Sequence, residues 1–283
     1  MARKAFLVFI LLLCAITVPY AQNKTTPKGS LFIIGGGTRS DALIARLVET
    51  AKLGAKDYII VLPMASEIPD SGYLYISQQL KAHTKANIRN FNFNKHDAHD
   101  SLWADSLANA KLIYILGGDQ NRFMKAVLNT PVYTAIHKAY QNGSTIAGTS
   151  AGAAVMSRFM ITGVQLKDSK YKETFDKLWD GNIEFSEGLG LLEHTIIDQH
   201  FLKRNRYNRI ISALADKPGY MGIGIDESTA IIVNGNKATV AGDSQVLSFV
   251  SPGKATVTTG GLLKFKKIEL GIYTAGDVIG IKP

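Results

Sequence analysis

The chain has a single cysteine, Cys14, which lies in an N-terminal segment that we expect to be removed. The mature protein would then contain no cysteine, which excludes disulfide bonds, thiol nucleophiles and cysteine-ligated metal ions. The sequence also has no internal repeat, no low-complexity tract and no long cationic run with interleaved aromatic residues. The net charge of +9 falls to +7 without Arg3 and Lys4, since 30 basic and 23 acidic residues remain. We therefore expect a solvated basic surface and no nucleic-acid partner.

The first 21 residues have the features of a secretory signal peptide. Arg3 and Lys4 form a short basic region, residues 5–16 form an apolar core, and Ala21 provides a cleavage site. The segment is too short for a membrane span and ends in a processing site, while Leu13 is too bulky for lipoprotein processing. An uncleaved anchor is the alternative. We predict a secreted or periplasmic protein without stable membrane association after cleavage. The predicted divisions are a signal peptide (1–21), a flexible segment (22–28) and a single domain (29–283).

In the whole sequence, 46% of the residues are hydrophobic, which allows a substantial core. Short apolar runs alternate with helical patterns over the first half of the chain. The runs are LFII (31–34), YIIVLP (58–63), NIRNFNF (87–93), KLIYILGG (111–118) and STIAG (144–148). Such an alternation is typical of a parallel sheet covered by helices on both faces. We predict a three-layer α/β domain with a mostly parallel central sheet. Short β-type runs after about residue 221 predict antiparallel additions to it.

The stretch TIAGTSAGAAVM (145–156) places Ser150 where a buried strand turns into a helix predicted to continue through AGAAVMSRFM. Chemistry in open α/β sheets lies at the carboxyl ends of the strands. Gly148 and Gly152 allow a sharp turn that would lift the hydroxyl outward, as in a nucleophile elbow. The amide of Ala151 could then face a developing oxyanion. The alternative is that Ser150 only caps the helix.

Three further stretches could complete a serine site. LGGDQNRF ends the fourth predicted strand, and the Gly118 amide could be a second oxyanion donor. IIDQHFLKRNRYNRI (196–210) brings His200, the best placed of the six histidines, to the end of an apolar run. A nucleophilic serine needs such a base and a group that orients it. Asp226 and Glu227 follow a later apolar run, and chemistry alone does not distinguish them.

Taken together, five motifs resemble the cyanophycinase family of serine peptidases, which are related to aspartyl dipeptidases and have a class I glutamine amidotransferase-like fold. The motifs are IIGGG (33–37), GGDQ (117–120), GTSAGA (148–153), DQHFLKRNRYNR (198–209) and GIDESTA (224–230). They occur in the family's order over most of the mature chain. Asn205 departs from the glycine expected between two of the arginines, although asparagine tolerates left-handed backbone better than most residues.

The resemblance implies a triad in which Ser150 is the nucleophile, His200 the general base and Glu227 the acid that orients it. It implies a substrate pocket formed by Gln120, Asp198, Gln199, Arg204, Arg206 and Arg209. It also implies hydrolysis of cyanophycin, an aspartate backbone with arginine on each side-chain carboxyl, releasing β-aspartyl-arginine without a metal or other cofactor. The family further suggests a homodimer. Export is unusual for an intracellular storage polymer, so other β-aspartyl peptides are also candidate substrates.

The implied pocket agrees with the chemistry of its residues. Guanidinium groups bind carboxylates in a bidentate manner, so the three arginines could hold the free carboxylates of the substrate. Arg206 and Arg209 share a helical face and Arg204 does not, which predicts a loop before a helix. The alternatives are a solvated basic face for the arginines, a structural salt bridge for Asp198 and a capping role for Gln120.

Three other classes of protein were weighed. A dinucleotide site at IIGGGTRSD lacks the third glycine of its fingerprint, because Ser40 occupies that position. An α/β-hydrolase esterase expects its histidine last, after the acid, and Asp180 would have to supply that acid. The third alternative is an inactive secreted protein that binds peptides or carboxylates. Such a protein would have no need to keep the serine, the histidine and the acid together.

Overall fold

The structure is a computed structural model that describes residues 26–168, 174–250 and 253–282. The predicted signal peptide (1–21) and most of the predicted flexible segment (22–28) lie outside the described residues. Within the described ranges, none of the helices has the length and apolar character that crossing a membrane requires.

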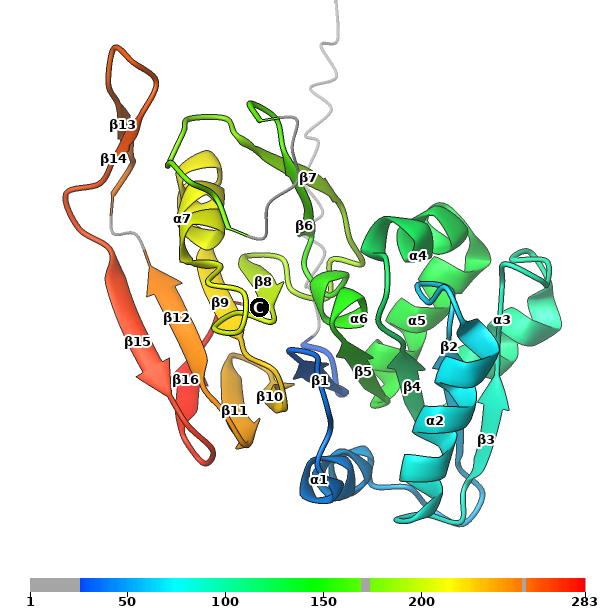
Figure 1. The fold of residues 1–283 in the computed structure, drawn as a ribbon. Coiled ribbons are helices and arrows are strands. Elements are labelled where there is room, and N and C mark those ends of the chain that lie inside the picture. The colour runs from blue at the N-terminus through cyan, green and yellow to red at the C-terminus, as the bar shows by residue number, and fades with distance from the viewer. Residues whose placement is uncertain (1–25, 169–173, 251–252, 283) are drawn as a thin grey trace, which may run out of the picture.

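An eight-stranded sheet runs through the described residues in the order β16-β11-β10-β1-β5-β4-β2-β3 (Figure 1). The parallel strands are β1 (Ser30–Ile34), β5 (Thr145–Thr149), β4 (Leu112–Ile115), β2 (Tyr58–Leu62) and β3 (Asn87–Asn90). The antiparallel strands are β10 (Thr229–Asn234), β11 (Lys237–Gly242) and β16 (Val278–Gly280). The predicted α/β class with a mostly parallel central sheet is therefore confirmed.

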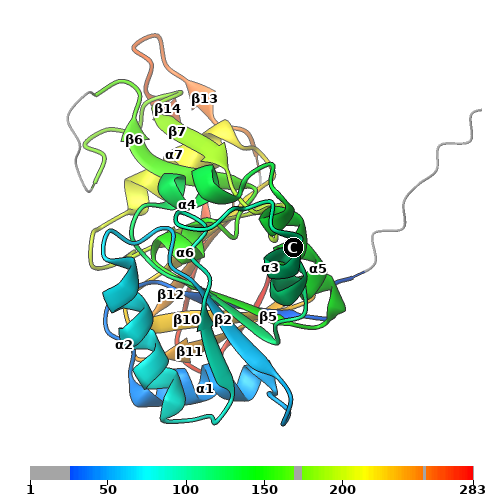
Figure 2. The same cartoon turned by 90° about the vertical axis from the view of Figure 1, so that its right-hand side faces the viewer.

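Helices cover both faces of this sheet, as Figure 2 shows. One layer has α1 (Asp41–Ala51) and α2 (Pro69–Lys81), and the other has α3 (Ser101–Ala108), α4 (Gln120–Val127) and α5 (Pro131–Asn142). Side chains alternate along each strand, so Phe32 and Ile34 of β1 pack toward the first layer, while Leu31 and Ile33 pack toward the second. This alternation produces two apolar cores, one on each face of the sheet.

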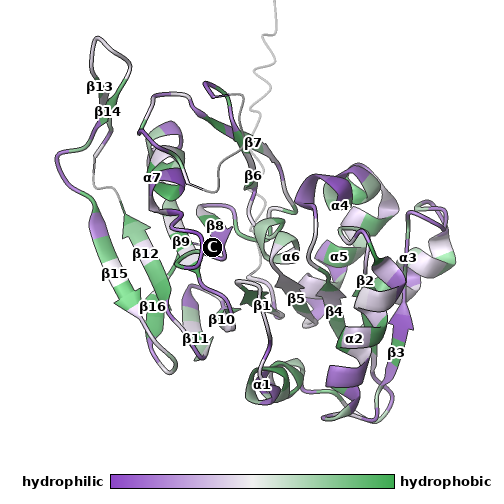
Figure 3. Cartoon of the chain, in the orientation of Figure 1, coloured by the Kyte–Doolittle hydropathy of each residue, from purple (hydrophilic) through white to green (hydrophobic). Residues whose placement is uncertain are grey.

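A second sheet of four strands lies beside the first, in the order β15-β12-β9-β8. Its strands are β8 (Thr195–Gln199), β9 (Met221–Ile225), β12 (Val246–Val250) and β15 (Glu269–Tyr273), and α7 (Tyr207–Asp216) packs on it. Two hairpins complete the described fold: β6 (Phe159–Gln165) with β7 (Ile183–Glu187), and β13 (Thr256–Val257) with β14 (Leu263–Lys264). Figure 3 shows the buried β12 as largely hydrophobic, and the edge strand β3 as hydrophilic.

The helix predicted over residues 151–160 is wrong beyond its first turn. Helix α6 spans only Ala151–Ala154, and the chain then enters β6 at Phe159. The small residues that begin this stretch favour a helix, but β6 pairs with β7 and joins a third apolar core against α7. Pairing with a strand some twenty residues away overrides the local preference. The predicted β-type runs after residue 221 are present as strands with antiparallel partners, and β9 also pairs in parallel with β8.

Candidate active site

Ser150 lies directly after β5, next to the centre of the main sheet, in a strained backbone conformation. Its φ of 53° and ψ of −111° place it in a region that side chains rarely adopt, and its N–H donates to Ile34 O at 3.0 Å. The turn needs its two glycines. A Cβ on Gly148 would lie 2.1 Å from Gly152 O, and one on Gly152 would lie 2.4 Å from Ile115 O. This tight packing pushes the serine side chain out of the sheet, at a cost of about 1–3 kcal/mol in backbone strain.

Two hydrogen bonds join Ser150 to a histidine and a carboxylate that are distant in sequence. Ser150 Oγ lies 2.8 Å from His200 Nε2, and His200 Nδ1 lies 2.7 Å from Glu227 Oε1. The neighbouring carboxylate of Asp226 has other partners: it accepts from Lys203 N–H at 2.9 Å and from the Ser244 hydroxyl at 2.8 Å. Glu227, and neither Asp226 nor the Asp180 of the esterase alternative, is thus the carboxylate in contact with the imidazole.

Burial lowers the pKa of His200, because a charged imidazolium loses hydration in the interior. The hydrogen bond that the Glu227 carboxylate accepts from the imidazole opposes this shift, and the positive charges of Arg204 and Arg206 add to it. The net pKa is lowered, so the imidazole is neutral near pH 7. Because the Glu227 carboxylate can only accept, Nδ1 carries the proton and Nε2 is left to accept the proton of the Ser150 hydroxyl.

The three glycines after β1 form the surface on which His200 and Glu227 lie. An added Cβ on Gly36 would lie 2.3 Å from His200 Cε1 and 2.5 Å from Nε2. One on Gly37 would lie 2.9 Å from Glu227 Oε2. Both glycines have positive φ, 111° and 70°, and Gly35 O accepts from His200 N–H at 2.8 Å. Sequence reasoning treated this run as a family motif and missed its contact with the imidazole, although three consecutive glycines at a strand end are a signal of close approach.

The predicted oxyanion donors belong to two segments beside the serine. Ala151 is the first residue of α6, so its N–H has no partner within the helix. Gly118 has a φ of +136° and follows Gly117, where an added Cβ would lie 3.8 Å from Ser150 Oγ. Because α6 is a single turn, its dipole is small, and any contribution to anion binding would come from the individual N–H groups.

Four of the predicted substrate-binding residues bond to one another instead of facing a solvent-filled cleft. They are Asp198, Gln199, Arg206 and Arg209, each less than 9% exposed. Arg209 binds both oxygens of Asp198, with Nε 2.8 Å from Oδ2. Arg206 Nη1 donates to the Gln199 carbonyl at 2.6 Å and also contacts the Gln199 and Asp198 side chains. Asp198 thus forms the structural salt bridge that was its alternative, and the network anchors the end of β8 that carries His200.

Arg204 and Gln120 are placed differently from these four. Arg204 lies in the loop before α7, as its spacing predicts; it is half-buried, and its N–H donates to His200 O at 3.0 Å. Asn205 adopts a φ of 51°, the left-handed conformation for which asparagine substitutes well. Gln120 does not cap α4, because Asp119 does so. Its Nε2 donates instead to the carbonyls of Ile161 and Thr162 on β6, each at 3.0 Å.

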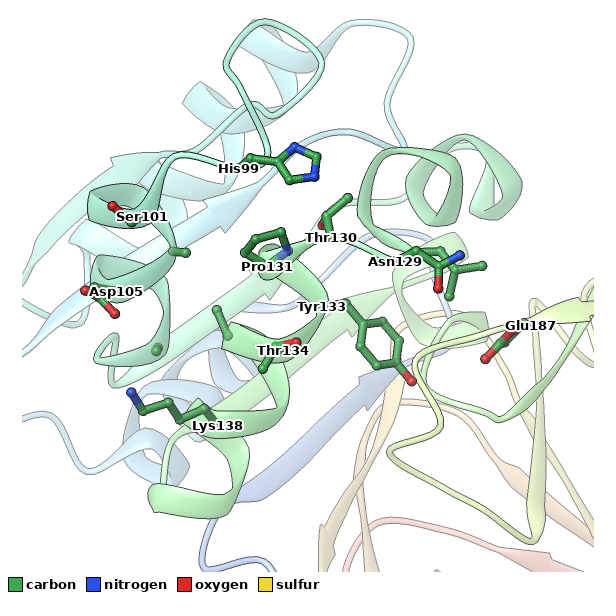
Figure 4. A pocket seen from close by; sticks show the side chains of 14 residues that line it. His99, Ser101, Asp105, Asn129, Thr130, Pro131, Tyr133, Thr134, Lys138 and Glu187 are labelled. Atoms are coloured by element: carbon green, nitrogen blue, oxygen red, sulfur yellow. The ribbon is translucent and has the colours of Figure 1, made fainter.

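A pocket of about 740 Å³ lies elsewhere, between α3, α5 and the end of β7 (Figure 4). Its lining includes His99, Asp105, Tyr133, Lys138 and Glu187. None of the predicted catalytic or substrate-binding residues lines it. In the ranges that the structure describes, no three His, Cys, Asp or Glu side chains are grouped as a metal site would require.

Comparison with known proteins places the same residues in a wider context. The model of peptidase family S51 matches residues 31–241. The cyanophycinase of Trichormus variabilis is 34% identical over 231 residues, which cover 76% of this chain and 74% of that protein. The cyanophycinase of Geminocystis herdmanii is 30% identical over 268 residues, covering 88% and 93%. A solved peptidase from an acI-B1 actinobacterium shares the fold, with a TM-score of 0.62 at 23% identity, covering 90% of this chain and 98% of its own. The S51 match includes Ser150, His200 and Glu227.

Proposed function

Since this chain belongs to peptidase family S51 and is a peptidase, we propose that it is an exported serine exopeptidase that hydrolyses cyanophycin or related β-aspartyl peptides. The observation that carries the proposal is the hydrogen-bonded series of Ser150, His200 and Glu227. The substrate class rests on the two cyanophycinase relatives. Export rests on the signal-like residues 1–21.

The proposed mechanism is an acyl transfer to water. His200 Nε2 takes the proton of the Ser150 hydroxyl while Oγ attacks the scissile carbonyl carbon. The N–H groups of Gly118 and Ala151 donate to the resulting oxyanion. Glu227 accepts from Nδ1–H and stabilises the imidazolium, which then protonates the leaving amine. Water activated by His200 hydrolyses the acyl-enzyme and restores the serine.

The arginines divide into two roles in this proposal. Arg204, half-buried beside His200, is the guanidinium that binds a carboxylate of the substrate. The Asp198–Arg209 and Gln199–Arg206 contacts hold the end of β8 and so keep His200 in place. A buried ion pair with additional hydrogen bonds suits such a positioning role, because breaking it would leave an uncompensated charge in the interior.

The proposal is tested by incubating the purified protein with cyanophycin, β-aspartyl-arginine, β-aspartyl-leucine and a simple ester, and identifying the products by mass. We expect β-aspartyl-arginine to be released from the polymer and the ester to be a poor substrate. A chain that hydrolyses the ester but neither the polymer nor the dipeptides would be an esterase. A folded protein that binds the peptides without cleaving them would be the inactive binding protein considered above.

The lowered pKa of His200 predicts the pH dependence of the reaction. Only the neutral imidazole can accept the serine proton, so kcat/KM should rise with pH and level off above that pKa. The half-maximal pH should therefore lie below about 6.5, the ordinary histidine value. Glu227→Gln removes the negative charge and the charge-assisted hydrogen bond that raise the pKa, so the half-maximal pH should fall further. A half-maximal pH above 7 in the unmodified protein would contradict this assignment of the base.

A further inference from the structure

The hairpin of β6 and β7 passes above α6, between α7 and α4 in the view of Figure 1. The chain runs from Ser150 directly into this hairpin, since α6 ends at Ala154 and β6 begins at Phe159. Gln120 fastens it from the other side through two hydrogen bonds to β6 carbonyls. Gln120 lies three residues after Gly117, which is packed against Ser150. The hairpin is therefore part of the wall around the reacting serine.

Glu184 on β7 is a half-buried carboxylate in this wall. Its Oε2 accepts from the Thr162 hydroxyl at 2.7 Å. The carbonyl of Thr162 is one of the two that Gln120 binds. The Glu184 carboxylate is therefore connected to α4 by a short series of hydrogen bonds. Among the described residues, no lysine or arginine forms an ion pair with Glu184.

The hairpin is irregular at this point. The pairing of β6 with β7 shifts between Ile161 and Gln165, and Gly163 has a φ of +96°. Such bulges redirect side chains and are frequent beside active sites. Thr162 and Glu184 lie next to this irregularity.

The charges around the serine are thus arranged with opposite signs. Arg204 lies beside His200 on the α7 side, and Glu184 lies on the hairpin. Withdrawing a carboxylate from water without a cation partner is unfavourable. A cationic group of the substrate would supply the partner that Glu184 lacks among the described residues, because a charge-assisted hydrogen bond forms between the two.

We propose that Glu184 is a specificity-determining residue that binds the cationic side chain of the substrate. This inference rests on the proposed function, and it names the group that the site selects: a guanidinium or ammonium group several bonds from the scissile carbonyl. In a cyanophycin unit that is cleaved at its backbone peptide bond, the guanidinium carbon is ten bonds from the scissile carbonyl carbon, roughly 12 Å when extended. A side chain of that length can contact a part of the site well away from the reacting carbonyl.

The test compares Glu184→Gln with the unmodified protein on a dimer of β-aspartyl-arginine units joined through the aspartate backbone, and on its neutral isostere with citrulline in place of arginine. We expect the unmodified protein to prefer the arginine peptide at least tenfold in kcat/KM. In Glu184→Gln the KM for the arginine peptide should rise roughly 10- to 100-fold with kcat little changed, since a charge-assisted bond is lost. Turnover of the citrulline peptide should stay within about threefold, so the preference should nearly disappear.

Glu187→Gln is the matched control. Glu187 is on the same strand, but its odd spacing from Glu184 places it on the opposite face, and it is exposed. We expect this variant to keep the preference for arginine. Thr162→Val is a second variant, which keeps the charge of Glu184 and removes the hydroxyl that orients it, and should reduce the preference partly. It also tests the proposal if Glu184→Gln does not fold.

The possible outcomes distinguish a failure of the proposed function from a failure of the role given to Glu184. If the unmodified protein cleaves neither β-aspartyl peptide nor polymer, the proposed function fails. If it cleaves the peptides, and Glu184→Gln and Thr162→Val both keep the full preference for arginine, the function stands and the role of Glu184 is overturned. An equal loss of turnover on the charged and neutral peptides by folded Glu184→Gln would also overturn it.

Discussion

Replacing Ser150 with alanine is expected to lower kcat by a factor on the order of 10⁵ or more, because the substitution removes the hydroxyl that we propose attacks the carbonyl. In serine peptidases the members of the triad act as a unit, so losing the nucleophile costs about as much as losing the whole triad. The oxyanion donors and the binding groups remain, so slow residual catalysis over water should persist. The release of β-aspartyl-arginine from cyanophycin, with single-turnover detection of an acyl-enzyme, measures the effect.

The folded structure should survive this change. Alanine keeps the Cβ and loses only the hydroxyl, which donates outward to His200. Ser150→Gly is the informative companion, since glycine adopts a φ of 53° without the strain of a side chain. We expect this variant to be equally inactive but more stable than Ser150→Ala, by on the order of 1 kcal/mol in the free energy of unfolding. An alanine variant with near-normal turnover would rule out Ser150 as the nucleophile.

Replacing Gly36 with alanine is expected to lower kcat by at least about 10²-fold without touching any group that reacts. The new Cβ would lie 2.3–2.9 Å from three atoms of the His200 ring, so the imidazole must move. A displacement of about 1 Å in a catalytic group is enough for a loss of this size. Because Ser150 would lose the base that activates it, labelling of the serine by a fluorophosphonate should slow in parallel with peptide turnover.

Gly276→Ala is the matched control for this prediction. Gly276 has a similar positive φ, 96° against 111°, but nothing lies within 4 Å of an added Cβ. Both variants therefore carry the backbone strain, and only Gly36→Ala has the contact with His200. We expect Gly276→Ala to lose some stability and to keep its kcat. Equal activity in the two variants would mean that the imidazole can shift without consequence, which would contradict the proposed position of the base.

Much of the fold could be predicted from local pattern alone. The five parallel strands of the main sheet match the predicted runs to within a few residues. For β1, β2, β4 and β5 the reason is that a strand buried on both faces needs an uninterrupted apolar sequence. The Gly–x–Ser–x–Gly spacing placed Ser150 at a strand end, since a tight turn leaves little choice of residue there. Asn205 in left-handed backbone follows from the same local rule.

Features that depend on distant contacts were not visible in the sequence. The first two residues of β6, Phe159 and Met160, were predicted to continue a helix, and only the pairing of β6 with β7 makes them part of a strand. His137 lies in a polar stretch of sequence, yet it is half-buried and its Nε2 lies 2.7 Å from Leu189 O. Helical spacing identified Arg209 as a neighbour of Arg206 but could not show that both turn inward to Asp198.

By itself, the sequence determined the α/β class, the position of the serine on its turn, and the membership of Ser150, His200 and the pair Asp226–Glu227 in one candidate site. These follow from hydrophobic periodicity and backbone stereochemistry, which act over a few residues. The tertiary structure decided that Glu227 contacts the imidazole, that Gly36 packs against it, and that Asp198 and Arg209 neutralise each other in the interior. Such contacts depend on how separate strands are placed against each other, and distance along the chain carries no information about them.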